Sequence, residues 1–187
     1  LGDLPTEREN GTMRELVSQM GGCASRETRE IKMAATKKLI RTYDINLCAF
    51  MELNFNWSKV NSSANLASWL QDEERELRSI TAHNTSESDG TFGKHQPGGT
   101  GMICRHEFIQ YARKPSVDPR GLGRWCSWPF SCNPIHVTRI VVAYRPCQRK
   151  SKGLKTIYQQ HMRYIQLRGL QTDPTTLFDA DLSQQIK

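Results

Sequence analysis

One acidic residue, Glu52, directly follows a run of mostly apolar residues, 45–51. A run of this length, bounded by Asp44 and by an Asn-rich segment, predicts a buried strand. A carboxylate at the exit of such a strand needs a partner, because an unpaired buried charge costs several kcal/mol. A divalent cation and an arginine side chain are both suitable partners, so these residues alone leave a metal site and a salt bridge open.

Two other segments have the same form, an apolar stretch beside residues that can bind or orient a ligand. Residues 139–143 lead to Tyr144, and residues 98–104 begin with a glycine turn that leads into a strand. Both stretches predict strands of a sheet-based α/β or α+β domain.

Segments spread along the chain, taken in order, resemble the endonuclease/exonuclease/phosphatase superfamily. More narrowly, they resemble the endonuclease domains that lie upstream of reverse transcriptases in non-LTR retrotransposons. The ordered set carries the resemblance rather than any single motif, and it extends over about residues 13–187. The matching segments are 18–22, 44–57, 82–84, 98–102, 121–125, 143–147 and 158–161.

The resemblance implies a four-layer α/β (α+β) sandwich, in which two packed mixed sheets are flanked by helices. It implies Mg²⁺- or Mn²⁺-dependent cleavage of DNA, for nicking in retrotransposition, and a reverse transcriptase domain as a partner in the same longer polypeptide. The chain is expected to be the N-terminal two-thirds of such a domain, because the family's Asp-x-Asn strand and terminal Asp–His pair are not found after Asp173. The alternatives are a catalytically dead nucleic-acid-binding remnant and a phosphomonoesterase or lipid phosphatase of the same superfamily.

The resemblance assigns metal binding to Glu52 and Gln19. Gln19 stands where the family has asparagine, and it offers the same amide oxygen one methylene further from the backbone. Tyr144 matches a family tyrosine that contacts the scissile phosphate, with an ordinary strand-end aromatic as the structural alternative. His83 and Asn84, at the exit of another predicted strand, are catalytic candidates on the same rim, and a structural role is equally open for them.

The candidates for nucleic-acid binding are Asn54, Arg145, Arg149, Lys150 and Lys152. Their basic side chains suit a DNA backbone, although a solvated basic loop is an equal alternative. Structural roles are favoured for Trp57 and His161, and also for Arg124, Trp125 and Trp128, which we expect to pack and form salt bridges. We expect Gln19, Glu52, Asn54, His83 and Tyr144 to converge at one edge of the sheets.

The charge balance favours an anionic partner. The net charge is +7 and the pI is near 9.2, and lysine and arginine release counterions when they bind a polyphosphate backbone. No run of apolar residues is long enough to span a membrane, and we expect neither a membrane nor a small-molecule cofactor as a partner. The six cysteines lack zinc-site spacing, which favours a reduced, intracellular location, and a DNA target places the protein in the nucleus.

The hydrophobic pattern predicts one domain over residues 13–187, preceded by a disordered or linker segment, 1–12. The first helix is expected to be capped by Ser25 and to have its apolar positions at Ile31, Ala34, Ala35 and Leu39. Further helices are predicted over 64–77, 151–168 and from Pro174 onward, and residues 84–99 are predicted to form a surface loop. Strands are predicted over 15–18, 45–52, 79–82, 100–104, 123–130 and 137–144.

Overall fold

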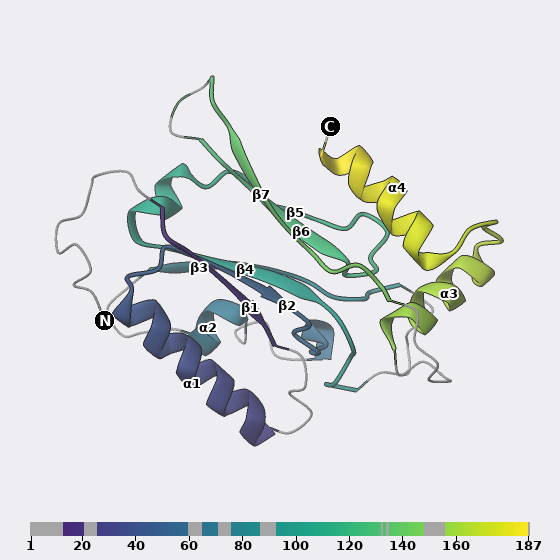
Figure 1. The fold of residues 1–187 in the computed structure, drawn as a ribbon, viewed down its shortest axis with the longest axis horizontal. Coiled ribbons are helices and arrows are strands. Elements are labelled where there is room, and N and C mark those ends of the chain that lie inside the picture. The colour runs from purple at the N-terminus through teal and green to yellow at the C-terminus, as the bar shows by residue number, and fades with distance from the viewer. Residues whose placement is uncertain are drawn as a thin grey trace.

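The computed structural model of this chain describes residues 13–20, 26–59, 65–70, 76–86, 93–131, 133, 135–147 and 156–186. These residues form two packed β-sheets with helices on the outer faces (Figure 1). The first sheet has the strand order β1-β2-β4-β3, and the second has the order β5-β6-β7. The strands are β1 (Glu15–Gln19), β2 (Leu47–Met51), β3 (Leu77–Ala82), β4 (Thr100–Arg105), β5 (Ser116–Val117), β6 (Trp125–Phe130) and β7 (Thr138–Ala143).

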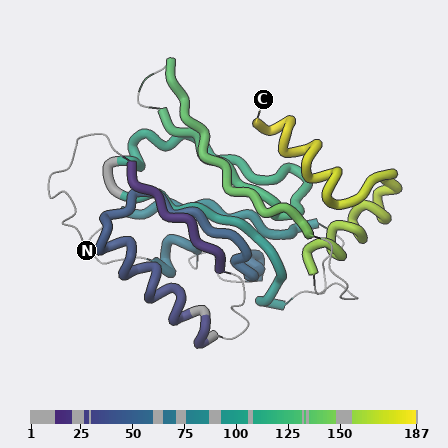
Figure 2. Tube along the Cα trace, in the orientation of Figure 1, coloured from purple at the N-terminus to yellow at the C-terminus, as the bar shows by residue number. Residues whose placement is uncertain are grey.

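The α-helices occur in the first part of the chain and after the last strand, along the path that Figure 2 shows. They are α1 (Arg26–Thr42), α2 (Leu66–Leu70), α3 (Ile157–Leu167) and α4 (Pro174–Ile186), with 3₁₀-helices η1 (Trp57–Lys59) and η3 (His106–Tyr111). The predicted fold class, a mixed α and β domain with two sheets and flanking helices, is confirmed. One detail differs, because every strand pair in the described second sheet is antiparallel rather than mixed.

Three strands of the first sheet end at the same border. β1 and β2 are parallel, and β4 is antiparallel to both β2 and β3, so β1, β2 and β3 run in one direction. The register places Gln19 beside Met51, Met51 beside Thr100, and Thr100 beside Ala82. We call the border defined by these four residues the exit edge.

The second sheet meets the exit edge through the loop that precedes β6. An isolated bridge between Asn84 and Leu122 joins the chain after β3 to this loop. Trp125, which begins β6, pairs with Ala143, which ends β7. β7 therefore also ends at the exit edge, as the predicted convergence requires.

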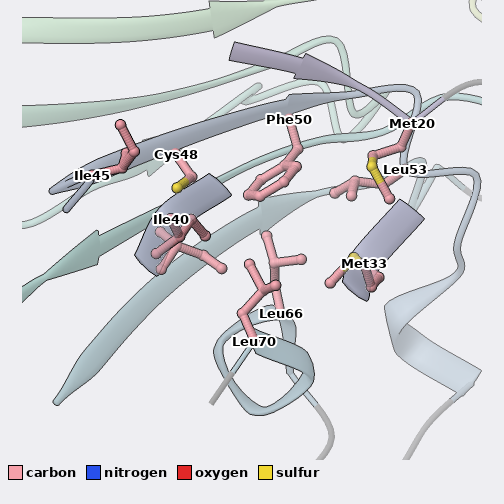
Figure 3. Packing of buried hydrophobic residues seen from close by; sticks show 10 residues of the cluster. Met20, Met33, Ile40, Ile45, Cys48, Phe50, Leu53, Leu66 and Leu70 are labelled. Carbon is pink, nitrogen blue, oxygen red and sulfur yellow. The ribbon is translucent and has the colours of Figure 1, made fainter. Parts of the chain in front are cut away.

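The strand β2 is buried on both faces, and this explains the apolar run before Glu52. Cys48 and Phe50 face the helices α1 and α2 (Figure 3). Leu47 and Ala49 belong to the apolar cluster between the two sheets. A strand covered on both sides needs apolar residues at successive positions rather than an alternating pattern.

The helix α4 covers the second sheet beside the exit edge. The ring of Phe178 packs edge-on against Trp125, with 5.9 Å between the ring centroids. Leu177 of α4, Ile165 of α3 and Leu122 form a third apolar cluster. The layers are therefore α1 and α2, the first sheet, the second sheet, and α4.

The buried face of α1 differs from the prediction. The helix forms as expected, but it buries Met33, Thr36 and Ile40, whereas Ile31 and Leu39 are 63% and 41% exposed. Both sets of residues have the three-to-four spacing of a helix, so the period alone does not select the face.

Two other predicted segments also need correction. The helix predicted over 64–77 is wrong at its C-terminal end, because α2 ends at Leu70 and Leu77 begins β3. The loop predicted over 84–99 is not wholly at the surface, since Asn84 and Gln96 are buried. The elements η1, η3 and β5 were not predicted. The predictions for residues 1–12, Ser25 and 151–155 lie outside the described residues. Among the described helices, none combines the length and the apolar character needed to cross a bilayer.

Gly123 allows the two sheets to approach closely at the exit edge. Its φ is +69°, and a Cβ at this position would lie 2.6 Å from the carbonyl carbon of His83 and 2.9 Å from the backbone nitrogen of Asn84. We expect Gly123→Ala to lower the free energy of unfolding by about 2–4 kcal/mol, because left-handed strain is added to a clash with backbone that cannot move aside.

Gly169→Ala is the matched control for this variant. Gly169 has a φ of +62°, but an added Cβ would meet nothing within 4 Å, so only the strain of about 1 kcal/mol applies. Urea unfolding of both variants measures the difference. Equal losses would show that the close approach at Gly123 carries no cost.

Candidate active site

Glu52 and Gln19 meet at the exit edge. Gln19 ends β1, Glu52 follows the parallel strand β2, and Nε2 of Gln19 donates a hydrogen bond of 3.0 Å to Oε2 of Glu52. Gln19 is exposed and Glu52 is half-buried, so solvent reaches the pair. Among the ion pairs of the described residues none includes Glu52, so no arginine serves as its partner there.

The backbone around Glu52 is held in an uncommon conformation. Glu52 and Asn54 both have a φ of +53°, in the left-handed region, where a residue other than glycine costs about 1–3 kcal/mol. The backbone N–H groups of Leu53 and Asn54 donate to the carbonyls of Gly99 and Gly98 at 3.2 and 2.7 Å. Oδ1 of Asn54 accepts from the N–H of Gly98 at 2.8 Å. The glycine turn therefore fixes the chain from which Glu52 projects.

Asn84 connects the exit edge to α3. Its Nδ2 donates to Oε1 of Gln160 at 3.1 Å, and its backbone carbonyl accepts from Nε2 of Gln96 at 2.7 Å. Its Oδ1 accepts from the backbone N–H and the hydroxyl of Ser86 at 3.0 and 2.8 Å. These bonds give Asn84 a clear structural role, and its catalytic role stays a prediction.

His83 is half-buried beside the same edge. Its Nε2 is buried and has no hydrogen-bond partner among the described residues. Burial lowers the pKa of His83 from its ordinary value of 6.5, because a charged imidazole loses hydration there. The imidazole is therefore neutral at pH 7 and able to accept a proton.

Tyr144 and Arg145 follow the last residue of β7. The N–H of Tyr144 donates to the carbonyl of Arg124 at 2.8 Å, which keeps the chain at the exit edge beyond the strand. Arg145 is paired with Asp179 of α4, to which its Nε and Nη2 donate at 2.9 and 2.6 Å. This pair is half exposed, so a phosphate can compete with the carboxylate. The other predicted DNA-binding residues, Arg149, Lys150 and Lys152, lie outside the described residues.

A buried ion-pair network holds the second sheet to α4. Arg124 donates to both oxygens of Asp118 at 2.7 and 2.9 Å and to Asp181 at 2.8 Å, and its side chain is 0% exposed. Arg120 makes two further bonds to Asp181, at 2.5 and 2.9 Å. The guanidinium of Arg124 also lies 4.3 Å from the ring centroid of Trp125. The predicted packing and salt-bridging role of Arg124 is confirmed, whereas Asp118 and Asp181 carry no local pattern that identifies them as partners.

His161 lies in the interior, where its position on the apolar face of α3 predicted it. Burial lowers its pKa from 6.5 to about 4, and the charge of Arg124 acts in the same direction. The Leu122 backbone and Asp118 oppose this shift but do not outweigh it. His161 is therefore a neutral interior side chain at pH 7 rather than a ligand of the candidate site.

Acid is expected to destabilise the chain through His161. The unfolded chain takes up this proton near pH 6.5 and the folded chain only near pH 4, so the stability contributed by the neutral imidazole is complete above pH 6.5. It is lost progressively as the pH falls to about 4, by about 3 kcal/mol in total. His83 acts in the same direction, because its pKa is also lowered.

Urea unfolding at several pH values measures this loss. His161→Gln should flatten the dependence between pH 6.5 and 4, whereas the exposed His136→Gln should leave it unchanged. The lowered pKa values of Asp173, Asp179 and Asp181 also reduce stability in acid, mainly below pH 4, and they do so equally in both variants. The same slope in wild type and His161→Gln would contradict the expectation.

No protein-family model matches the sequence, and no curated protein matches it. Among solved structures, the chain is similar to an endonuclease/exonuclease/phosphatase family protein from Leptotrichia buccalis C-1013-b, with 14% sequence identity and a TM-score of 0.47. The similarity covers 86% of this chain and 64% of that protein, so the chain spans just under two-thirds of its length.

Proposed function

We propose that this chain is the N-terminal part of a metal-dependent phosphoester hydrolase of the endonuclease/exonuclease/phosphatase type that nicks DNA. The contact between Glu52 and Gln19, 3.0 Å long at the exits of two parallel strands, carries the proposal. Carboxylate and amide oxygens are hard donors of the kind that Mg²⁺ prefers. The net charge of +7 supports an anionic substrate. Retrotransposition, a reverse transcriptase partner domain and a nuclear location belong to the same proposal.

The two side chains fit an open site for Mg²⁺ or Mn²⁺. Mg²⁺ usually keeps several waters and binds proteins through one or two carboxylates together with a substrate phosphate. The described part of the chain contains no group of three His, Cys, Asp or Glu side chains that could enclose an ion, so a closed zinc site does not fit. Gln19 would turn its amide so that Oε1 faces the ion beside Glu52. A bound ion would neutralise the charge that develops on the phosphate.

Other side chains at the exit edge would complete the chemistry. Tyr144 would donate its hydroxyl hydrogen to a phosphate oxygen and so stabilise developing negative charge. His83, neutral at pH 7, would accept a proton from the attacking water. Asn54 and Arg145 would bind neighbouring phosphates, the latter in place of its bond to Asp179.

Two measurements test the proposal. In Mg²⁺ the full-length protein that contains this chain should convert supercoiled plasmid to open-circular DNA, and EDTA should abolish the conversion. Titration with Mn²⁺, followed by electron paramagnetic resonance, should show one bound ion per chain that is lost in Glu52→Gln. Absence of both nicking and Mn²⁺ binding would overturn the proposal.

A second candidate function is nucleic-acid binding without cleavage. The lack of a three-residue metal cluster among the described residues favours it, because a sparse donor set binds an ion weakly. This candidate requires DNA binding that weakens with salt and no nicking at any Mg²⁺ concentration. Release of phosphate from a nucleoside monophosphate, without nicking, would instead indicate a phosphomonoesterase.

A further inference from the structure

Three aromatic rings gather just beyond Glu52. The ring centroids of Phe55 and Trp57 are 5.0 Å apart, those of Phe55 and Trp69 4.7 Å, and those of Trp57 and Trp69 4.6 Å. Phe55 is buried, whereas Trp57 and Trp69 are only partly buried. The outer part of this cluster therefore presents indole surface to solvent. We call these two tryptophans the indole platform.

The indole platform is tied to the candidate active site by a short, well-held segment. Asn54, whose backbone is fixed by the glycine turn, directly precedes Phe55. Phe55 forms an isolated bridge with His95, and the N–H of Asn56 donates to the carbonyl of Lys94 at 3.0 Å. A ligand bound at Glu52 would therefore meet the platform within a few residues of chain.

The surroundings of the platform suit a ligand that is both aromatic and anionic. Lys59 is exposed at the end of η1, and Lys94 and His95 are exposed on the neighbouring segment. A lipid tail would use only the rings, whereas a nucleotide would also use the lysines.

We propose that Trp57 and Trp69 form a stacking platform for an unpaired base of single-stranded nucleic acid whose backbone passes the Glu52 edge. This inference rests on the proposed function, because it places one nucleic-acid strand at both the Glu52 edge and the indole platform. Stacking on an aromatic face is available to every base, so the platform favours single-stranded over duplex segments without selecting a sequence. The phosphates next to the stacked base would lie near Lys59 and Lys94.

The four tryptophans of the chain allow a direct test. Trp125 and Trp128 are 1% and 3% exposed, so a base that quenches tryptophan emission from the surface acts on Trp57 and Trp69. The probe is an oligothymidylate, titrated in EDTA so that no cleavage occurs. Its control is an abasic oligonucleotide of the same length and charge. We expect the thymidine oligonucleotide to quench the emission and to bind about tenfold more tightly than the abasic one.

Two variants locate the effect. Trp69→Leu keeps an apolar side chain and should remove most of the preference for bases, and Trp69→Phe, which keeps an aromatic face, should retain part of it. Tyr43→Leu removes another exposed aromatic side chain, one outside the platform, and should change nothing. If Trp69→Leu does not fold, the comparison of the two oligonucleotides on the wild-type chain decides.

The outcomes separate this inference from the proposed function. Equal affinity for the thymidine and abasic oligonucleotides, in a chain that nicks plasmid, overturns the platform and leaves the nuclease proposal intact. A tenfold base preference without nicking and without Mn²⁺ binding supports the platform and overturns only the catalytic proposal. Emission changes with anionic phospholipid vesicles but not with oligothymidylate would overturn the platform in favour of a lipid surface.

Discussion

Glu52→Gln is expected to reduce magnesium-dependent nicking about a hundredfold to a thousandfold while the fold survives. The change is nearly isosteric, and the hydrogen bond with Gln19 can persist in another form. A neutral amide oxygen is a poorer ligand for a hard dication than a carboxylate, so the ion binds more weakly. DNA binding in EDTA should be unchanged or slightly stronger, because a negative charge near the phosphate has been removed.

The control for this variant is Glu15→Gln. Glu15 is an exposed carboxylate on the same strand as Gln19, but at the end opposite the exit edge, and its substitution changes the net charge equally. Melting temperature and nicking rate should be measured on one preparation of each variant. If Glu52→Gln lowers the melting temperature while the folded protein nicks at the wild-type rate, Glu52 is a structural residue and not a metal ligand.

Arg124→Met is expected to lower the free energy of unfolding by about 3–5 kcal/mol. The variant keeps an unbranched apolar stem but removes the guanidinium group and its charge. Asp118 and Asp181, whose side chains are 1% and 11% exposed, would then lose the cation that they share inside the protein. A buried carboxylate without a partner must either protonate or leave the interior, and both cost stability.

Arg145→Met provides the matched comparison, because Arg145 also makes a two-pronged bond to an aspartate. The side chains of Arg145 and Asp179 are 55% and 51% exposed, and exposed pairs contribute about 0–1 kcal/mol. Chemical denaturation of the two variants therefore compares a buried arginine network with an exposed arginine–aspartate pair. Similar losses in Arg124→Met and Arg145→Met would show that burial of the network is not what stabilises it.

The position of the candidate site followed from the sequence because its residues end strands. The apolar run before Glu52 and the shorter one before Gln19 each specify a strand and its exit, and parallel strands bring their exits together. The same reasoning could not choose the buried face of α1, since Met33, Thr36 and Ile40 share their spacing with Ile31 and Leu39. That choice depends on the packing of α1 against β2 and α2, which no local pattern encodes.

The sequence does not identify the hydrogen-bond and ion-pair partners of buried polar groups, for a similar reason. Asn84 pairs with Gln160, and Arg124 pairs with Asp181, across long stretches of chain. Glutamine and aspartate on helices usually face solvent, so neither α3 nor α4 signals that one of its polar side chains turns inward. Arg124 itself was expected to form a salt bridge, but only the folded chain shows to which acids.

The left-handed backbone at Glu52 distinguishes two kinds of selection. Glycine and asparagine adopt a φ near +53° more readily than glutamate does. A library randomised at position 52 and sorted only for resistance to protease should therefore enrich glycine and asparagine. A library sorted for nicking should return the carboxylate. If the two pools differ in this way, the glutamate at position 52 is retained for its charge at a cost in folding stability.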